Sequence, residues 1–478
     1  MILTAIGLEL RTLARSPLRL LVVALVLGTG LLVVLRGQQE VTAWEESLAA
    51  GEAEAQESLA EARACFEEGR PGPEDRPWID LSAPRWQDWY AGTRLARQPA
   101  ALASIAHASA EAGAVTVRVN RYANPLLATG SKIENPALAV TGGLDLVTVL
   151  TLLLPLLVLA LGVEVGSQER SMGILPLIRV QSGRDRSWIV QRCLAIGLLV
   201  SAVGLTLCLA AGLAAGAGLT ALLPLIATVL AYVAFWTALL ATIALVARHP
   251  SQGAVALGSS WIALCVVIPA LGVSRSASLA AGDFGLDLTV EARDAGGLVD
   301  ELADEELLAA VFERFPALEG LQPEDVSPRR GAEDAHEILD LERRLASREV
   351  VAQEQSRLVE QLAWLSPAIA FSGALEGLAG RGPEAAREYR QQVVSAAATR
   401  MESYVASTWR GTPLDAEDFE ALVRSSATTL PSQVTPPTRA LWILALWTVL
   451  LTGLASQISR TRTGSSKPQE LELRAATS

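Results

Sequence analysis

Uncharged, apolar runs recur along the chain and divide it into segments of different character. The runs cover residues 20–35, 146–163, 193–247, 250–274 and 440–459. An α-helix rises about 1.5 Å per residue, so roughly 20 apolar residues cross the ~30 Å hydrocarbon core of a membrane. A buried helix of a soluble protein is usually shorter and striped with polar residues. The pattern therefore predicts membrane-spanning helices.

The run 193–247 is too long for a single crossing. Its 55 residues would extend roughly 80 Å as one helix, so the run must fold back once. We expect the bend in the Ala/Gly-rich stretch 210–220, which is followed by Pro224. With this bend the chain has six spans. The first run could instead be a cleaved signal peptide, but no small-residue cleavage site follows it, and we interpret it as a retained span.

Basic residues predict which side of the membrane each loop occupies. They precede the first span, lie between spans two and three and between spans four and five, and follow the sixth span. With six spans all of these positions lie on one side, which we assign to the cytoplasm, so both termini are cytoplasmic. The residues are Arg11, Arg15, Arg19, Arg170, Arg179, Arg184, Arg186, Arg192, Arg248, Arg460, Arg462, Lys467 and Arg474. Lysine is scarce, which suggests a GC-rich bacterial genome and hence the bacterial cytoplasmic (inner) membrane.

Charge is divided unequally between the two sides. The segments assigned to the outside are residues 37–143, with 15 acidic and 9 basic residues, and 274–438, with 29 and 15. Their net charges are −6 and −14, whereas the rest of the chain carries +8. The 51% hydrophobic content excludes a disordered chain, and the total charge of −12 argues against a nucleic-acid binder. An acidic outer surface usually serves solubility, but it also suits cationic ligands or partners.

Both outer segments have the pattern of helices. Residues 39–68 are rich in Ala, Glu and Leu, and we expect them to continue span one beyond the membrane. Further helices are expected over 300–315, 333–365, 384–409 and 416–425. Cys65 is the one cysteine outside the spans, so no intrachain disulfide can join the segments. The predicted fold is an all-α polytopic membrane protein, with six transmembrane helices and a mainly helical extracytoplasmic domain built from the two inserts.

The sequence contains no recognisable site for covalent chemistry. A phosphate-binding loop needs a lysine within a glycine-rich loop, and neither Lys132 nor Lys467 has that setting. His107, His249 and His336 are scattered and have no cysteine at ligand spacing. We therefore expect no catalytic residue, no cofactor and no metal site, so that this chain is not an enzyme. Spans three to six also lack charged residues, which argues against an ion-coupled carrier and suggests energy delivered from elsewhere.

The segment 164–192, between spans two and three, is short and rich in arginine. Glu169 is placed to begin a short helix, where its charge complements the helix dipole. Gly173 would let another backbone approach closely, and Ser182 and Gly183 would form a turn. These features suit the docking of another protein, but an ordinary positive-inside loop could carry the same residues. On the residues alone, both interpretations stay open.

The same segment resembles the coupling loop of ABC-2-type permeases, the membrane subunits of ABC transporters. The matching residues are Glu169, Arg170, Gly173, Leu175, Ser182, Gly183, Arg184 and Arg192. A second motif is similar to one in a bacterial subgroup of this family, which has large extracytoplasmic inserts after the first and fifth spans. It consists of Ser366, Pro367, Ala368, Phe371, Leu375, Leu378, Ala379 and Gly380. The Phe-rich continuation usual in that subgroup is replaced here by Arg381, Gly382 and Pro383.

The resemblance implies a division of the chain. Residues 1–36 would form an interface helix and the first span, 37–143 the first extracytoplasmic insert, 144–273 spans two to five with the coupling loop 164–192, 274–438 the second insert, and 439–478 the sixth span and a cytoplasmic tail. The residues that would couple the chain to a separate P-loop ATP-binding subunit are Glu169, Arg170, Gly173, Ser182, Gly183 and Arg184. ATP and Mg²⁺ would be held by that partner.

The implied function is that of a permease subunit of a bacterial ABC transporter, and of an exporter in particular. It would work with a second permease subunit, either identical or paired, would contact membrane lipid and would bind no nucleic acid. The alternative is a membrane sensor or a mechanotransmitting scaffold that uses the extracytoplasmic helical domain. A sensor should carry a recognisable cytoplasmic output module, and the short cytoplasmic segments argue against one.

Overall fold

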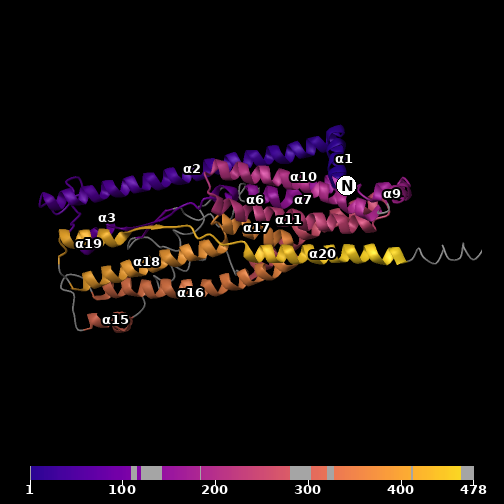
Figure 1. Ribbon diagram of the computed structural model, residues 1–478. Coiled ribbons are helices and arrows are strands. Elements are labelled where there is room, and N and C mark those ends of the chain that lie inside the picture. The colour runs from indigo at the N-terminus through magenta and orange to yellow at the C-terminus, as the bar shows by residue number, and fades with distance from the viewer. Residues whose placement is uncertain are drawn as a thin grey trace, which may run out of the picture.

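A computed structural model describes residues 2–108, 116–119, 143–182, 185–279, 303–319, 328–410 and 413–464. The molecule is elongated, with a bundle of long helices and a second body beyond one end of the bundle (Figure 1). We call this second body the insert domain; it contains the described residues of 38–119 and 303–437 apart from α17 (Pro367–Leu378), which packs into the bundle. We call the opposite end of the bundle the loop end; it carries residues 2–15 and 164–192.

Among the residues that the structure describes, six helical stretches are long and apolar enough to cross a membrane, which confirms the six predicted spans. In chain order they are α2 (Pro17–Glu67), Leu146–Ser171, α10 (Asp185–Ala214), α11 (Leu219–Val246), Pro250–Leu279 and α20 (Thr438–Gly464). At the centre, α11 packs along α10 and α20 and buries the rings of Tyr232, Phe235 and Trp236. The fold is that of an all-α polytopic membrane protein.

Two of the spans are composite, because each contains one turn of π-helix. The second span runs through α6 (Leu146–Thr148), η2 (Val149–Leu153), α7 (Leu154–Gly162) and α8 (Ser167–Ser171), and the fifth through α12 (Pro250–Ile262), η3 (Ala263–Val267) and α13 (Ile268–Leu279). The π-helical turns are η2 and η3. A π-helical turn interrupts the regular i→i−4 hydrogen bonds and is frequent at functional sites. Carbonyl groups in these two turns become acceptors for side chains.

The long uncharged run folds back where the sequence predicts. α10 ends at Ala214 and α11 begins at Leu219. Gly216 adopts a φ of +61°, which favours glycine and lets the chain reverse tightly. Pro224 lies inside the first turns of α11 rather than in the bend itself.

The first span continues far beyond the bundle. α2 is a single helix of 51 residues, about 75 Å long at 1.5 Å per residue. It begins at a cap in which the Ser16 side chain accepts a hydrogen bond from the Arg19 N–H, and Pro17 occupies the first helical position. Its second half forms one edge of the insert domain (Figure 1), as predicted for residues 39–68. The indole N–H of Trp44 donates to the Arg97 carbonyl at 3.0 Å and ties this half to the rest of the domain.

The remaining helices of the insert domain match the helices predicted for the second segment. They are α15 (Asp304–Arg314), α16 (Pro328–Leu365), α18 (Pro383–Arg410) and α19 (Ala416–Ser426), with the short α3 (Pro84–Tyr90) from the first segment. α16 and α18 lie side by side (Figure 1). Pro367 stands at the start of α17, so the proline both ends α16 and begins a new helix after Ser366.

A small sheet joins the two inserts, and the helical pattern of the sequence did not predict it. Its strands are β1 (Thr93–Arg97), β2 (Thr116–Val119) and β3 (Ala427–Leu430), in the order β2-β1-β3. β1 pairs antiparallel with β2 and parallel with β3, so strands about 330 residues apart lie side by side. Leu95, Val117 and Val119 pack on α18 through Tyr389 and Val393. The inserts therefore form one body, as expected, but the sheet is part of what joins them.

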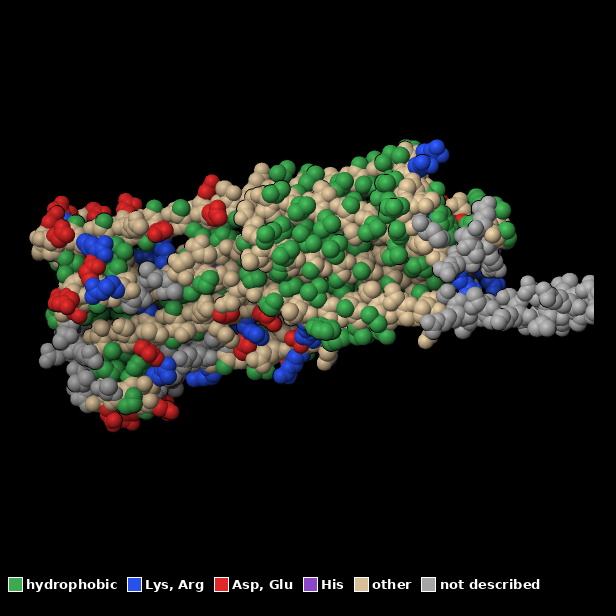
Figure 2. Space-filling model, viewed as in Figure 1, with side chains coloured by type: hydrophobic (Ala, Val, Ile, Leu, Met, Phe, Trp, Pro, Cys, Tyr) green, Lys and Arg blue, Asp and Glu red, His purple; other side chains and the backbone are tan. Residues whose placement is uncertain are grey.

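Side chains are distributed as a membrane-spanning bundle requires. Figure 2 shows hydrophobic side chains covering the bundle, and acidic side chains concentrated on the insert domain. The exposed hydrophobic residues of the outermost spans include Leu21, Leu25 and Leu32 of α2 and Trp442 and Val449 of α20. Because such surface is unfavourable in water, these faces are suited to lipid or to another membrane subunit. The chain is a multi-pass membrane protein.

Candidate functional site

The loop between spans two and three forms two short helices at the loop end. α8 (Ser167–Ser171) completes the second span, and α9 (Leu175–Ser182) follows after a tight turn. In Figure 1, α9 projects past the ends of the neighbouring spans, and α1 (Ile2–Arg15) lies across their direction at the same end. Of the candidate coupling residues, Glu169 and Arg170 lie on α8, Ser182 lies on α9, and Gly173 lies in the turn between the two helices.

Glu169 begins α8 as predicted, but its side chain is turned into the protein. One carboxylate oxygen accepts a hydrogen bond from the Gly166 N–H at 2.7 Å, which closes the first turn of α8. The other accepts from the guanidinium of Arg192 on α10. Glu169 is 8% exposed. It therefore fixes the loop to the bundle and offers no surface to a docking protein.

Arg192 binds a second carboxylate as well, and the three side chains form what we call the Arg192 cluster (Glu9, Glu169 and Arg192). Its Nε donates to Glu9 Oε1 at 2.5 Å, and Glu9 on α1 is 4% exposed. The cluster thereby joins α1, α8 and α10, three elements far apart in sequence. Two buried carboxylates and one guanidinium are held in a region of low dielectric, where ion pairs are strong and an unpaired charge is costly.

Arg170 also points inward, onto the end of span four. Its guanidinium donates to the carbonyls of Ala244 at 2.8 Å and Leu245 at 3.0 Å, and also to that of Ala247. The last carbonyls of a helix have no partner within the helix and carry the negative end of its dipole. Arg170 satisfies them at the end of α11. The loop is thus attached to spans three and four and to α1.

Within the chain, a close backbone approach occurs at Gly166. Gly166 has a φ of +78°, and a Cβ added there would lie 2.6 Å from the Ala244 carbonyl oxygen. At Gly173, with a φ of +68°, an added Cβ would meet nothing within 4 Å. Gly173 instead ends α8, where its N–H donates to the Arg170 carbonyl and that of Ile174 to the Glu169 carbonyl. Gly173 therefore makes a turn with open space around it, and the approach of a partner's backbone to this glycine stays a prediction.

An apolar stripe is exposed on the surface of α9 and the turn before it. Met172 is 62% exposed, Ile174 40%, Leu177 57% and Val180 85%. Ile174, Leu177 and Val180 are spaced three residues apart, which places them on one face of a helix. On the other side, Leu175 packs against the core of the bundle. We call Met172, Ile174, Leu177 and Val180 the α9 stripe. Sequence reasoning missed it, although its three-residue spacing was readable in the sequence.

The remaining candidate residues follow the stripe. Ser182 is the last residue of α9, whereas Gly183 and Arg184 lie outside the described residues. In the ranges that the structure describes, no group of three or more His, Cys, Asp or Glu side chains is arranged to hold a metal ion. All four cysteines are buried and unbonded.

The second sequence motif lies at the opposite end of the bundle, where α17 packs among the spans. The Ser366 hydroxyl donates to the Leu264 carbonyl of η3 at 2.6 Å and caps α17 by accepting from the Ile369 N–H. The Phe371 ring stacks on that of Tyr232, with centroids 4.0 Å apart and planes 6° apart. We call the contacts of Ser366, Phe371, Tyr232 and Leu264 the α17 junction.

Side chains also bind the other π-helical turn, η2. The Tyr232 hydroxyl donates to the Thr151 carbonyl of η2 at 2.9 Å, and the Trp261 indole donates to the Leu152 carbonyl at 3.2 Å. Side chains of spans four and five and of α17 thus satisfy backbone carbonyls of both π-helical turns. The motif residues Leu375, Leu378 and Ala379 are buried in the same core as the spans. The motif therefore joins the insert domain to the membrane bundle.

Comparison with known proteins identifies one segment of the chain. A family described as "Domain of unknown function (DUF3526)" matches residues 289–428, most of the second insert, including the motif at the α17 junction. No curated protein and no solved structure is significantly similar to the chain.

Proposed function

We propose that this chain is the permease subunit of a bacterial ABC transporter, driven by a separate P-loop ATP-binding subunit that docks on the α9 stripe. The observation that carries the proposal is the combination of an exposed apolar surface on α9 with a base that is fixed to three other elements. Val180 and Leu177 are open to solvent, while Glu169 and Arg170 tie the preceding turn to α10, α1 and α11.

A coupling element needs both properties. It must offer a surface that a partner can bury, and it must pass the partner's movement to the spans without bending. Packed helices and hydrogen-bonded charges transmit a displacement as a rigid-body shift. A partner that moves α9 would thus act on spans two, three and four together, through Arg170 and the Arg192 cluster.

The energy source follows from the sequence and the resemblance. The chain contains no glycine loop with a lysine that could cradle phosphates. ATP and Mg²⁺ are then bound by the partner, and this chain does no covalent chemistry. Export is the direction that the ABC-2 resemblance implies.

The proposal includes the orientation of the chain in the membrane and its assembly with a second subunit. The loop end faces the cytoplasm of a bacterium with both termini, because Arg11, Arg15, Arg186 and Arg248 gather there. The insert domain lies outside the cytoplasmic membrane. The exposed faces of the outermost spans contact lipid and a second permease subunit, identical or paired.

The docking surface is tested with exposed residues, because substitution of buried Glu169 would disturb the fold. We expect Leu177→Arg and Val180→Arg to abolish co-purification with a co-expressed P-loop ATP-binding subunit, and to abolish any stimulation of its ATP hydrolysis by this chain. The matched control is Val350→Arg on α16, which is 60% exposed in the insert domain. Retained binding and ATP hydrolysis in both α9 variants would refute the proposal.

A mechanotransmitting scaffold is the second candidate, and the continuity of α2 favours it. One helix of 51 residues joins the loop end of the bundle to the insert domain without a break, so a movement of span one is carried outward. Both candidates require the same ATP-binding partner. Reconstitution in vesicles separates them, because only a transporter moves a substrate across the membrane.

A further inference from the structure

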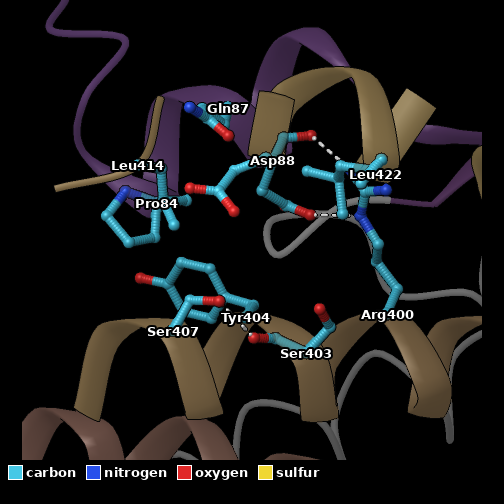
Figure 3. Close-up of a pocket in the computed structure, with 11 residues that line it drawn as sticks. Pro84, Gln87, Asp88, Arg400, Ser403, Tyr404, Ser407, Leu414 and Leu422 are labelled. Carbon is cyan, nitrogen blue, oxygen red and sulfur yellow. Dashed lines mark hydrogen bonds and ion pairs between the residues drawn. The ribbon is translucent and has the colours of Figure 1, made fainter. Parts of the chain in front are cut away.

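A cavity lies where the first insert meets the second. It has a volume of about 260 Å³ and is enclosed by α3, α18 and α19 (Figure 3). Its inner wall is formed by the buried residues Gln87, Asp88, Arg400 and Tyr404, whereas the mouth carries exposed side chains. Binding cavities for drug-sized molecules range from about 300 to 1,000 Å³, so this one suits a smaller molecule.

A buried ion pair forms the base of the cavity. Arg400 Nε donates to Asp88 Oδ1 at 2.6 Å, and the two side chains are 5% and 4% exposed. Arg400 also reaches the Asp88 backbone carbonyl at 3.4 Å. Among the described lining residues Arg400 is the single cation, and its charge is taken up by Asp88. The cavity therefore offers an anion no uncommitted positive charge.

Gln87 leaves a hydrogen-bond acceptor unused beside this ion pair. The residue is fully buried, and its amide nitrogen donates to the Asp415 carbonyl at 3.2 Å. That bond fixes the orientation of the amide, which lies beside Asp88 in the wall of the cavity (Figure 3). The oxygen, Oε1, is buried and has no hydrogen-bond partner in the structure. A buried acceptor without a partner is costly, and a ligand that donates a hydrogen bond would relieve the cost.

The rest of the lining favours donors and a small apolar body. Ser403, Ser407 and Asp418 contribute hydroxyl and carboxylate oxygens, and Pro84, Leu414 and Leu422 contribute apolar surface. Asp418 is exposed at the mouth, and the two inserts carry net charges of −6 and −14. A cation is attracted to such a site, and an anion is repelled.

We propose that this cavity binds a small organic amine, whose protonated amino group donates a hydrogen bond to Gln87 Oε1 and is attracted by the Asp418 carboxylate. Its short apolar body packs against Pro84, Leu414 and Leu422. The bound molecule contacts α3 of the first insert and α18 and α19 of the second, so it stabilises the contact between the two inserts. The site requires no ATP-binding partner and is independent of the proposed transport function.

Binding is tested on the purified full-length chain with three probes that share one body and differ in charge. The probes are 2-phenylethylamine, 2-phenylethanol and 3-phenylpropanoate, and their binding is followed by isothermal titration calorimetry. Ala421→Trp closes the mouth of the cavity, because Ala421 lines it and is exposed. Ala416→Trp, on the exposed first residue of the same helix and outside the lining, is the matched control for non-specific uptake by detergent.

We expect the amine to bind the native chain and the Ala416→Trp control alike, and Ala421→Trp to abolish this binding. The alcohol should bind about tenfold more weakly, because charge-assisted hydrogen bonds are the stronger ones. Asp418→Asn should also weaken binding of the amine about tenfold, because the side chain loses its charge. Its amide oxygen can still accept from the Asp415 N–H, so the local structure is kept. Equal heats in Ala421→Trp and the native chain, no heat with the amine, or tighter binding of the carboxylate would each overturn the proposal.

Discussion

Different kinds of contact hold the helices together at the two ends of the membrane bundle. At the loop end, contacts between distant elements are made by charges: the Arg192 cluster, the hydrogen bonds of Arg170 to the end of α11, and an ion pair between Arg19 and Glu164 at 2.6 Å. At the α17 junction the contacts are neutral: the Ser366 hydroxyl on the Leu264 carbonyl and the stacked rings of Phe371 and Tyr232.

This difference shows how each end can respond to a partner. The buried charged groups at the loop end lie directly behind an exposed apolar surface, so a protein that docks there would shift them as a unit. The α17 junction lies within packed aromatic and aliphatic side chains, and it holds the insert domain in register with the spans. Under the proposed function, a partner's movement would enter at the loop end and would be passed on to the insert domain at the α17 junction.

Removal of the cation at the loop end should have the largest effect. Arg192→Met leaves the buried carboxylates of Glu9 and Glu169 without their partner, and breaking a buried ion pair costs about 3–5 kcal/mol. We expect that loss in the free energy of unfolding, measured by SDS titration of the detergent-solubilised chain. The triple variant Glu9→Gln, Glu169→Gln, Arg192→Met should regain a large part of the loss. An unchanged free energy of unfolding in Arg192→Met alone would show that the Arg192 cluster does not stabilise the loop end.

Two glycines with the same backbone conformation should differ in their response to alanine. Gly166→Ala adds the strain of a positive φ to a clash with the Ala244 carbonyl, and we expect a loss of about 3 kcal/mol in the free energy of unfolding. Gly173→Ala adds the strain alone, about 1–2 kcal/mol. Thermal unfolding of both variants in detergent checks the order. A larger loss for Gly173→Ala would contradict the placement of the close approach.

The neutral junction should yield a smaller effect. Ser366→Ala removes an N-cap and a hydrogen bond to a π-helical carbonyl, which together contribute about 1–2 kcal/mol. Ser372→Ala is the control on the same helix, because the Ser372 hydroxyl bonds only within α17, to the Ile369 carbonyl. The same SDS titration should place Ser372→Ala within about 0.5 kcal/mol of the native chain. Equal losses of the free energy of unfolding in the two variants would show that the Ser366 contacts do not stabilise the α17 junction.

Substitution on the α9 stripe should have the smallest effect on stability. Leu177→Ser changes a side chain that is 57% exposed, so the free energy of unfolding should stay within about 0.5 kcal/mol of the native value. Its effect should appear only in binding of the ATP-binding subunit. A loss of stability comparable to that of Ser366→Ala would mean that the stripe packs within this chain.

The spans and the main helices could be predicted from the sequence, because their signal is local. An uncharged run of 16 or more residues indicates a membrane-spanning helix by itself, and the Ala- and Glu-rich continuation of α2 indicates a helix by its own composition. The sheet could not be predicted, since β1 and β3 are short, contain arginine and threonine, and gain their stability from pairing across about 330 residues. Thr-Val-Arg-Val at β2 gave an alternating signal, but four residues are too few to outweigh a helical surrounding.

The sequence predicted where the loop between spans two and three lies and that Glu169 begins a short helix there, but it did not predict the contacts that the loop residues make. The segment 164–192 does form two short helices at the loop end, and Glu169 does begin one of them. Its partner Arg192 is 23 residues away on α10 and also binds Glu9 of α1, 183 residues from Arg192, so the inward direction of the carboxylate had no local signal. The cavity of the insert domain likewise combines Gln87 with Arg400 and Asp418, which only the folded chain brings together.

Site-specific photo-crosslinking tests the central claim, that the α9 stripe is the docking surface of the ATP-binding subunit. A photoreactive amino acid is placed at Val180, or at Val350 as the control, in membranes that also contain a co-expressed P-loop ATP-binding subunit. The account predicts an adduct with that subunit from position 180 and none from position 350. No adduct from position 180, or equal adducts from both positions, would contradict it.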